Sequence, residues 1–358
     1  MQPEQVIPAH RGAAENPPNR FEKIHLERDE EWNPEEDPLP RTQFLKDSSK
    51  SIIAYNDSPD IGFEASVNPY RGCEHGCIYC YARPFHEYLG FSSGLDFETK
   101  IMVKENAPKL LREELSSPKW KPQVIAMSGV TDCYQPVERK LKITRGCLEV
   151  LAEFRNPVGI VTKNFLVTRD IDLLSELARH SAVAVYISLT TLDTELRKIM
   201  EPRTSPPAAR LEAIRRLSEA GVHVGILMAP IIPGLTDHEI PAVLAVAAAA
   251  GAKSAGYVPL RLPHAVAPLF EQWLETHFPD RKEKVLNRLR SMRGGKLYDS
   301  KFGQRMRGDG IFAEQIDQLF DVARRKVGIA ERGGNLSAAA FRRPAGAQME
   351  LDLLNPRS

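Results

Sequence analysis

The chain has 358 residues, 42% of them hydrophobic, and a formal net charge of +1 at neutral pH. This length predicts one large domain with extensions, or two domains, with enough apolar residues for a sizeable core. With so small a net charge, the protein as a whole does not attract nucleic acid or membranes electrostatically, so any basic patch that does so must be local. The longest apolar run, residues 242–250, is too short to span a bilayer, and the N-terminus lacks a secretory signal pattern.

Cysteine usage indicates a reducing compartment. The chain has only five cysteines, and three of them lie within residues 73–80. This pattern argues against a disulfide framework and is typical of a metal site in an intracellular protein. We therefore expect a cytoplasmic protein that does not cross a membrane.

Residues 1–60 are polar, rich in proline and acidic in places, so they predict an irregular N-terminal extension. From residue 61 to residue 262, short apolar runs alternate with longer amphipathic ones. The expected strands are Ala65–Pro69, Gln123–Met127, Val158–Thr162, Val183–Leu189, Val222–Met228 and Ala255–Leu260. The expected helices are Glu105–Leu115, Arg139–Phe154, Asp170–His180, Pro206–Ala220 and His238–Ala250.

This alternation predicts an α/β fold with a parallel sheet. The pattern fades after roughly 200 residues, whereas a full eight-fold barrel takes about 250. We therefore expect an incomplete (β/α)6 TIM-like barrel, with ligands at the carboxyl ends of its strands. Residues 263–329 predict a helical C-terminal extension, which includes a helix near Phe312–Arg325. Residues 330–358 are rich in Gly, Ala and Arg and predict a disordered tail.

The segment Asn68–Tyr81 carries the most specific chemistry. Cys73, Cys77 and Cys80 follow the spacing C-x3-C-x2-C on a loop that also contains glycines. Three thiolates are one ligand short of a closed structural zinc site. The same three thiolates on a [4Fe–4S] cubane leave one iron free for another ligand. A zinc knuckle or an inert metal loop is the alternative interpretation.

Polar residues follow several of the expected strands and so gather at the barrel mouth. They are Gly129, Thr131 and Asp132 after the second strand, Lys163 after the third, Ser188 and Thr190 at the end of the fourth, and Arg203 beyond them. Lys163 and Arg203 are candidates for pairing with a carboxylate, and the hydroxyl groups for ribose or carboxylate. The sixth strand, around Tyr257, offers an apolar wall and backbone edges for an adenine. For each residue, turn chemistry, a solvated surface or plain core is the alternative.

The cysteine spacing, with Tyr79 directly before the last cysteine, resembles that of the radical SAM superfamily. The resemblance implies a [4Fe–4S] cluster on Cys73, Cys77 and Cys80, with S-adenosylmethionine on the open iron. It implies that one electron cleaves this cofactor to methionine and a 5′-deoxyadenosyl radical, which abstracts a hydrogen atom from a substrate. An electron donor such as flavodoxin or ferredoxin is implied as well.

A narrower resemblance, from Arg11 through Phe320, is to the spore photoproduct lyase-like subgroup labelled "DNA repair photolyase". The motifs that carry it are Thr131–Pro136, Pro230–Asp237, Leu260–Pro263 and Arg305–Gly310. It implies a lyase-like reaction on a DNA lesion and cofactor contacts from Tyr79, Tyr81, Thr131, Asp132, Lys163 and Ser188. One departure concerns the hydrogen-donating cysteine of the lyase, whose position is Gly129 here. Cys133 is the candidate donor instead, or else a core residue.

Two further segments suggest partners. Gln348–Leu353 resembles the bacterial sliding-clamp-binding peptide Gln-Leu-x-Leu-x-Leu. The basic residues of 293–307, with Tyr298 and Phe302 among them, predict either a phosphate contact or a solvated surface. Two alternatives to DNA repair remain open. The first is radical SAM modification of a tRNA, peptide or small metabolite, and the second is a non-catalytic metal-binding or clamp-tethered adaptor.

Overall fold

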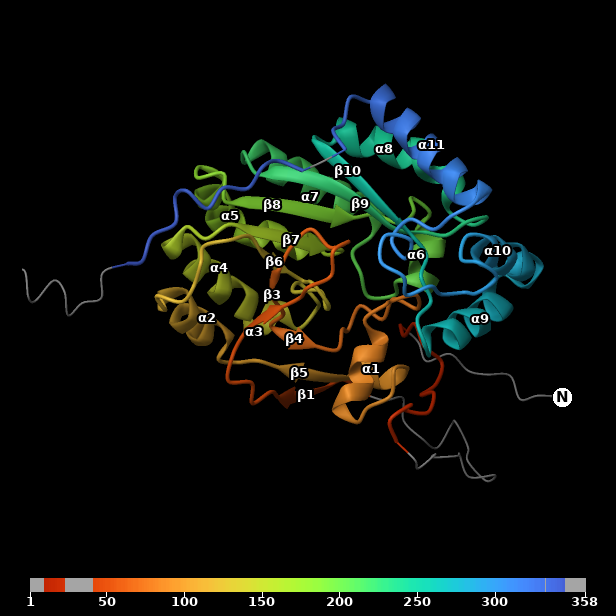
Figure 1. The fold of residues 1–358 in the computed structure, drawn as a ribbon, viewed down its shortest axis with the longest axis horizontal. Helices are drawn as coiled ribbons and strands as arrows, with labels where there is room; N and C mark the ends of the chain where they lie inside the picture. Colours follow the sequence, from red (N-terminus) through yellow and green to blue (C-terminus); the bar gives the residue numbers. More distant parts are fainter. Residues whose placement is uncertain (1–9, 23–40, 332, 345–358) are drawn as a thin grey trace, which may run out of the picture.

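The computed structural model describes residues 10–22, 41–331 and 333–344. Its centre is a seven-stranded sheet in the order β10-β9-β8-β7-β6-β3-β2 (Figure 1). The strands are β2 Ile53–Tyr55, β3 Ala65–Val67, β6 Ile125–Met127, β7 Val158–Thr162, β8 Val183–Ser188, β9 His223–Ile231 and β10 Ser254–Pro259. The strands from β3 to β10 pair in parallel, and β2 pairs antiparallel to β3.

These six parallel strands confirm the predicted α/β class. Each lies within a few residues of an apolar run in the sequence, as expected for strands buried on both faces. The sheet ends at β10 on one edge and at β2 on the other, so it is open in the described part of the chain.

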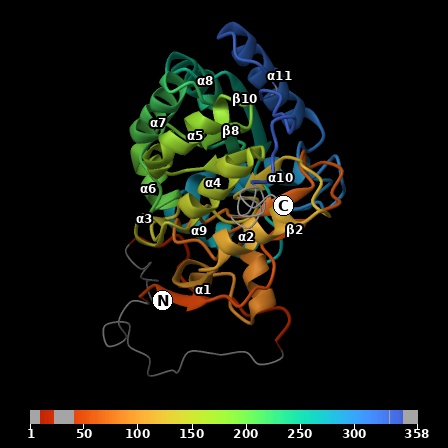
Figure 2. The ribbon, with the colours of Figure 1, turned by 90° about the vertical axis from the view of Figure 1, so that its left-hand side faces the viewer.

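Helices on the outer side of the sheet connect the parallel strands (Figure 2). They are α2 Ala107–Ser116, α3 Glu138–Leu141, α4 Ile143–Phe154, α5 Ile171–Ala178, α6 Thr194–Met200, α7 Pro207–Glu219 and α8 Ile240–Ala249. Short 3-10 turns occur at η1 Arg83–Leu89, η2 Phe165–Asp170 and η3 Asp237–Glu239. Leu148 and Leu151 of α4, and Ile214 and Leu217 of α7, are fully buried and join the central core. Burial of such faces is the main source of stability for helices of this length.

A second, smaller sheet lies below the large one in Figure 1, beside α1 Leu95–Thr99. Its order is β1-β5-β4, with β1 Gln43–Lys46, β5 Lys100–Val103 and β4 Tyr70–Arg71. The sequence pattern did not predict this sheet, and β1 and β2 are regular elements within the extension expected to be irregular. Since β4 ends directly before Gly72, this sheet anchors the start of the cysteine loop.

The C-terminal extension is helical, as predicted, with α9 Val266–His277, α10 Pro279–Ser291 and α11 Ile311–Lys326. Helices α9 and α10 share one buried apolar cluster with Cys77, Ile78 and Tyr79. Trp273 of α9 also donates its indole N–H to the carbonyl of Ile199, at 3.0 Å. The extension therefore packs directly against the cysteine loop.

The prediction of a disordered tail from residue 330 is wrong for residues 333–344. The amide of Ser337 donates to the Ser181 carbonyl and the amide of Arg342 to the Phe154 carbonyl, both at 2.9 Å. Phe341 also packs against Phe154. The clamp-like segment Gln348–Leu353 lies outside the described residues, so its role stays a prediction. No helix of the described chain is long and apolar enough to cross a membrane.

Candidate active site

The cysteine loop begins at the end of β4 and turns back on itself twice. Gly72 and Gly76 have φ angles of +79° and +65°, which side chains rarely adopt. The Gly76 amide donates to the Cys73 carbonyl at 3.3 Å, and the Cys80 amide to the Cys77 carbonyl at 3.2 Å. These turns place Cys73 and Cys77 in buried positions and Cys80 in a partly buried one.

The three thiols lie within electrostatic range of one another. Burial raises the pKa of all three, and at Cys73 the charges of Asp132, Cys77 and Cys80 raise it further. The positive charge of Lys163 opposes this at Cys77 and Cys80. Because metal ligands must be thiolates, these thiols need the positive charge of a bound metal to deprotonate at neutral pH.

The donor set fits an iron–sulfur cluster better than a single ion. No group of three or more His, Cys, Asp or Glu side chains in the described residues is placed to hold one metal ion. Structural zinc draws four ligands onto one atom. The thiolates of a cubane bind different irons, so they stand farther apart than the ligands of one ion. Cys73, Cys77 and Cys80 supply three thiolates, the number that leaves one iron of a cubane open.

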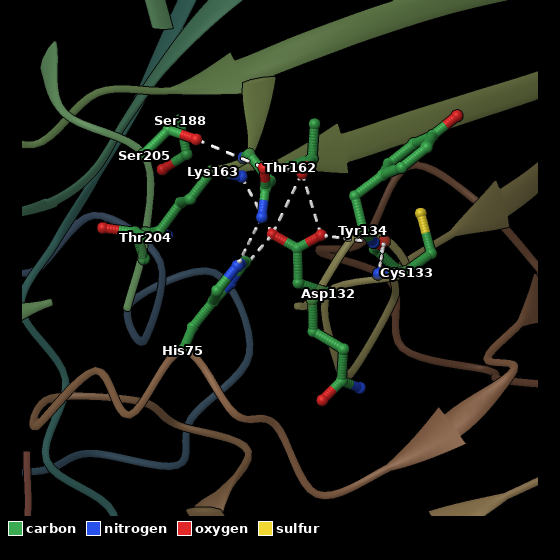
Figure 3. Close-up of polar contacts among 12 residues, drawn as sticks. His75, Asp132, Cys133, Tyr134, Thr162, Lys163, Ser188, Thr204 and Ser205 are labelled. Carbon is green, nitrogen blue, oxygen red and sulfur yellow. Dashed lines mark hydrogen bonds and ion pairs between the residues drawn. The ribbon is translucent and has the colours of Figure 1, made fainter. Parts of the chain in front are cut away.

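Asp132 links the cysteine loop to the ends of β6 and β7 (Figure 3). Its carboxylate accepts hydrogen bonds from the Thr162 hydroxyl and the Lys163 amide, both at 2.8 Å, and from the Tyr134 amide at 2.9 Å. His75 Nδ1 lies 3.3 Å from the same carboxylate. Burial raises the pKa of Asp132, but His75 and these donors outweigh it, so the pKa is lowered. Most of the carboxylate's capacity is thus used within the protein.

His75 was not identified from the sequence, although it lies inside the cysteine loop. Its Nε2 lies 3.2 Å from the side-chain amide of Asn164, which follows β7. With Nδ1 on Asp132, the ring ties the loop to the ends of two parallel strands. Only its position between two cysteines could have signalled this role.

Glu201 forms a second buried anchor, also missed from the sequence. Its carboxylate accepts hydrogen bonds from Tyr79, from Arg210 and, at 2.7 Å, from Thr190. Burial raises the pKa of Glu201, but the charges of Arg210 and Lys163 and the Tyr79 hydroxyl outweigh it and hold the pKa at about 2. The Tyr79 hydroxyl is therefore held by an ionised carboxylate, and the Thr190 hydroxyl donates to the same carboxylate.

Three other side chains predicted to bind the cofactor, Tyr81, Thr131 and Ser188, donate hydrogen bonds to backbone carbonyls of the protein. The Tyr81 hydroxyl donates to the Gly129 carbonyl at 2.7 Å, which brings these two predicted residues together at the end of β6. The buried Thr131 hydroxyl donates to the Tyr70 carbonyl at 2.7 Å, and the buried Ser188 hydroxyl to the Ala229 carbonyl at 3.3 Å.

Two predicted residues lie differently from expectation. Arg203 pairs with Glu74 of the cysteine loop at 2.9 Å, so a carboxylate of the protein already binds its guanidinium. The Tyr257 hydroxyl donates to Asp317 of α11 at 2.7 Å, and its ring packs on Phe320. The Tyr257 side chain therefore faces the helices, so an adenine at β10 would meet the strand's backbone and its opposite face instead.

The position of Cys133 does not match that of a hydrogen donor. Its thiol is fully buried in the central core, and in Figure 3 it points away from the Asp132 carboxylate. Burial and the neighbouring Asp132 charge raise the pKa of this thiol well above its ordinary value. Cys147 is fully buried in the same core, as expected.

The N-terminal residues 10–20 pass over the outside of the cysteine loop, and we call them the strap. The amides of Gly12 and Ala13 donate to the buried carboxylate of Glu98 at 3.0 and 2.9 Å. Arg83 is fully buried and binds the same carboxylate, and it also donates to the Cys77 carbonyl at 3.0 Å. The strap and the loop are therefore held by one shared ion pair.

The contact between strap and loop leaves no room for a side chain. A Cβ atom at Gly12 would lie 1.7 Å from the Gly76 carbonyl oxygen. Gly12→Ala is therefore expected to lift the strap, at a cost of about 1–3 kcal/mol in unfolding free energy. The cluster absorbance of reconstituted protein should then bleach several-fold faster in air. Gly62→Ala is the control, because its Cβ would meet nothing within 4 Å. Equal bleaching rates in both variants would show that the strap does not protect the site.

Comparison with known proteins places this geometry in context. A family model described as the radical SAM superfamily matches residues 67–247. The uncharacterized protein Rv2578c of Mycobacterium tuberculosis (strain ATCC 25618 / H37Rv) is 39% identical over 220 residues, 61% of this chain and 65% of that protein. The uncharacterized protein MJ0683 of Methanocaldococcus jannaschii is 31% identical over 199 residues, 56% of this chain and 71% of that protein. The chain thus spans less than two thirds of the length of the mycobacterial relative.

Among solved structures, the chain is similar to a spore photoproduct lyase complexed with a dinucleoside spore photoproduct. The TM-score is 0.57 and the identity 14%, over 80% of this chain and 81% of that one. At this identity the likeness concerns the fold.

Proposed function

Because the chain belongs to the radical SAM superfamily, we propose that Cys73, Cys77 and Cys80 hold a [4Fe–4S] cluster whose fourth iron binds S-adenosylmethionine. The observation that carries this is the loop itself, which brings three thiols to the carboxyl ends of the parallel strands, the number that leaves one iron of a cubane open. When bound, the reduced cluster supplies the electron that cleaves S-adenosylmethionine to methionine and a 5′-deoxyadenosyl radical. The protein supplies binding, orientation and shielding from solvent.

Lys163 is the best candidate to hold the carboxylate of S-adenosylmethionine. Its ammonium lies 5.8 Å from the centre of the Tyr79 ring, and no carboxylate pairs with it among the described residues. An ammonium beside a thiol loop suits an anionic group. The backbone near Gly129, at the end of β6, suits the amino group of the same cofactor. Asp132 and Glu201 act as positioning residues, since protein donors occupy their carboxylates.

The electron comes from a separate donor protein, such as a flavodoxin or ferredoxin. The chain has five cysteines, and the two outside the loop, Cys133 and Cys147, are fully buried in the core. They are too few and too enclosed to hold a second cluster.

The proposed substrate class is nucleic acid, and the proposed reaction is a lyase-like repair of a DNA lesion. Its support is the shared fold with spore photoproduct lyase and the subgroup motifs of the sequence. A tRNA, a peptide or a small metabolite is the alternative substrate.

Irradiated DNA provides the direct test of this substrate. Reconstituted, dithionite-reduced protein is expected to form 5′-deoxyadenosine faster with ultraviolet-irradiated DNA than with the same DNA kept dark. Loss of a photoproduct from the irradiated strand should accompany the increase. Chromatography of nucleosides and of the digested DNA measures both. Equal rates with the two DNA samples, and no lesion lost, would redirect the search to the other substrates.

A further inference from the structure

Large aromatic side chains lie exposed around the cysteine loop. Phe21, Phe85 and Tyr88 are 55%, 51% and 67% exposed, whereas aromatic side chains in the core are almost fully buried. The rings of Phe21 and Tyr88 stand 4.8 Å apart, and those of Phe85 and Tyr88 6.5 Å apart. Clusters of exposed apolar groups of this kind mark interaction sites.

More aromatic side chains lie near the end of β6, where the Tyr81 hydroxyl donates to the Gly129 carbonyl. Tyr81, which follows the last cysteine directly, is 41% exposed and lies under the guanidinium of Arg261 at 5.2 Å. The ring of His264, three residues after Arg261, packs beside the ring of Tyr298, with 6.3 Å between the ring centres. We call this set the aromatic rim, and its members are Phe21, Tyr81, Phe85, Tyr88, Tyr298 and Phe302.

Guanidinium groups accompany these rings. Arg20 lies 4.7 Å from the centre of Phe21 and 5.6 Å from that of Tyr88. Arg305 lies 4.7 Å from the centre of Phe302, which is 57% exposed. Alternating planar aromatic and guanidinium groups suit the stacking of nucleobases, because every base has a π-face. The exposed large aliphatic side chains of the described chain lie on α3, α8 and α11 instead.

The basic segment 293–307 has few cations left for phosphate. Arg293 is buried and donates to the Leu260 carbonyl at 2.9 Å. Arg305 pairs with Asp60 at 2.5 Å, and Arg307 with Asp317 at 2.9 Å. The three arginines are thus used within the protein, and Lys296 and Lys301 are the exposed cations that remain in this segment. The aromatic rim is therefore distinguished by its exposed aromatic rings and not by a row of unpaired basic side chains.

We propose that the aromatic rim binds unpaired bases of single-stranded nucleic acid and leads the strand to the barrel mouth. The inference rests on the proposed function for its substrate class and adds the form of the substrate. In a duplex the base faces are covered by neighbouring pairs, so only an unpaired or splayed-out strand offers them to these rings. Tyr81 connects the surface to the site, because its hydroxyl binds the Gly129 carbonyl.

Fluorescence anisotropy with the full chain tests the rim. The probes are a short labelled DNA strand, the same strand with abasic sites, and its duplex. We expect the intact strand to bind most tightly, and Phe21→Leu with Tyr88→Leu to weaken binding roughly tenfold or more, at the stacking energy typical per base. Tyr88→Phe keeps the ring and should bind as wild type. Tyr55→Leu is the matched control, because Tyr55 is equally exposed, at 67%, on the edge strand β2.

The outcomes separate this inference from the proposed function. Equal affinity of wild type and the double variant, or of the intact and abasic strands, would overturn the stacking role. Tighter binding of the duplex would overturn the preference for unpaired bases. If wild type cleaves S-adenosylmethionine but binds no strand, the inference fails while the cofactor chemistry stands. If the double variant loses strand binding and keeps substrate-free cleavage, the rim acts in substrate binding alone.

Discussion

Replacing Cys73, Cys77 or Cys80 by alanine is expected to reduce the cleavage of S-adenosylmethionine to background. Each thiolate holds a different iron of the proposed cluster, so losing one leaves two irons open and the cluster poorly held. The brown absorbance of reconstituted protein should be lost in the same variants. Spectroscopy of the cluster and chromatography of 5′-deoxyadenosine measure the two effects.

Cys147→Ala is the matched control for these variants. Cys147 is also a buried free cysteine, but it lies in the core on α4. The control should keep both the cluster and the cleavage. A cluster that survives in all three loop variants would contradict the assignment of ligands.

Arg210→Met is expected to cause a large loss of folding stability. Arg210 and Glu201 are both almost fully buried and pair directly. Without its partner, Glu201 would remain as an uncompensated buried charge, which costs about 3–5 kcal/mol. Denaturant unfolding of the cluster-free protein measures this as a lower transition midpoint. Because Glu201 also binds Tyr79, the variant should take up less iron on reconstitution.

Arg215→Met serves as the control for Arg210→Met. Arg215 pairs with Glu212 and Glu219 on the exposed face of α7. Such surface pairs contribute little, so the midpoint should not move. Equal midpoints for both variants would mean that the buried pair does not stabilise the fold.

The large sheet was predictable from the sequence because its strands are apolar runs separated by helices. Val158–Thr162 matches β7 at both ends, and the other parallel strands differ only near their ends. The small sheet was not predictable, since β1, β4 and β5 have two to four residues each and are held by pairing with distant segments. Residues 333–344 were misjudged for a related reason. Their composition suggests disorder, whereas long-range contacts such as Phe341 on Phe154 hold them.

The candidate site shows the same division. Spacing alone identified the three cysteines, and the rule that parallel strands end at one edge identified Asp132 and Lys163. Asp132 and Lys163 do lie beside the loop, with the Lys163 amide on the Asp132 carboxylate at 2.8 Å. His75, Glu201 and Arg83 were missed, because their partners are distant in sequence or are backbone atoms. The strand that contains Tyr257 was predicted correctly, but the Tyr257 side chain points toward α11 and not toward the proposed cofactor site.

The structure suggests why the regions outside the parallel sheet matter for the proposed chemistry. The strap covers one side of the cysteine loop through Gly12 and Glu98. Helices α9 and α10 cover another side through the apolar cluster that includes Ile78 and Tyr79. A cluster held there would be shielded from solvent, and water exclusion strengthens electrostatic interactions within a site.

The proposed chemistry depends on a [4Fe–4S] cluster that is held by the cysteine loop and binds S-adenosylmethionine. Electron paramagnetic resonance of the anaerobically reconstituted, dithionite-reduced protein tests it most directly, with iron, sulfide and zinc analysed in the same sample. We predict a reduced-cluster signal that changes when S-adenosylmethionine is added, followed by the appearance of 5′-deoxyadenosine. Zinc in place of iron and sulfide, or a cluster signal that S-adenosylmethionine does not alter, would contradict the account.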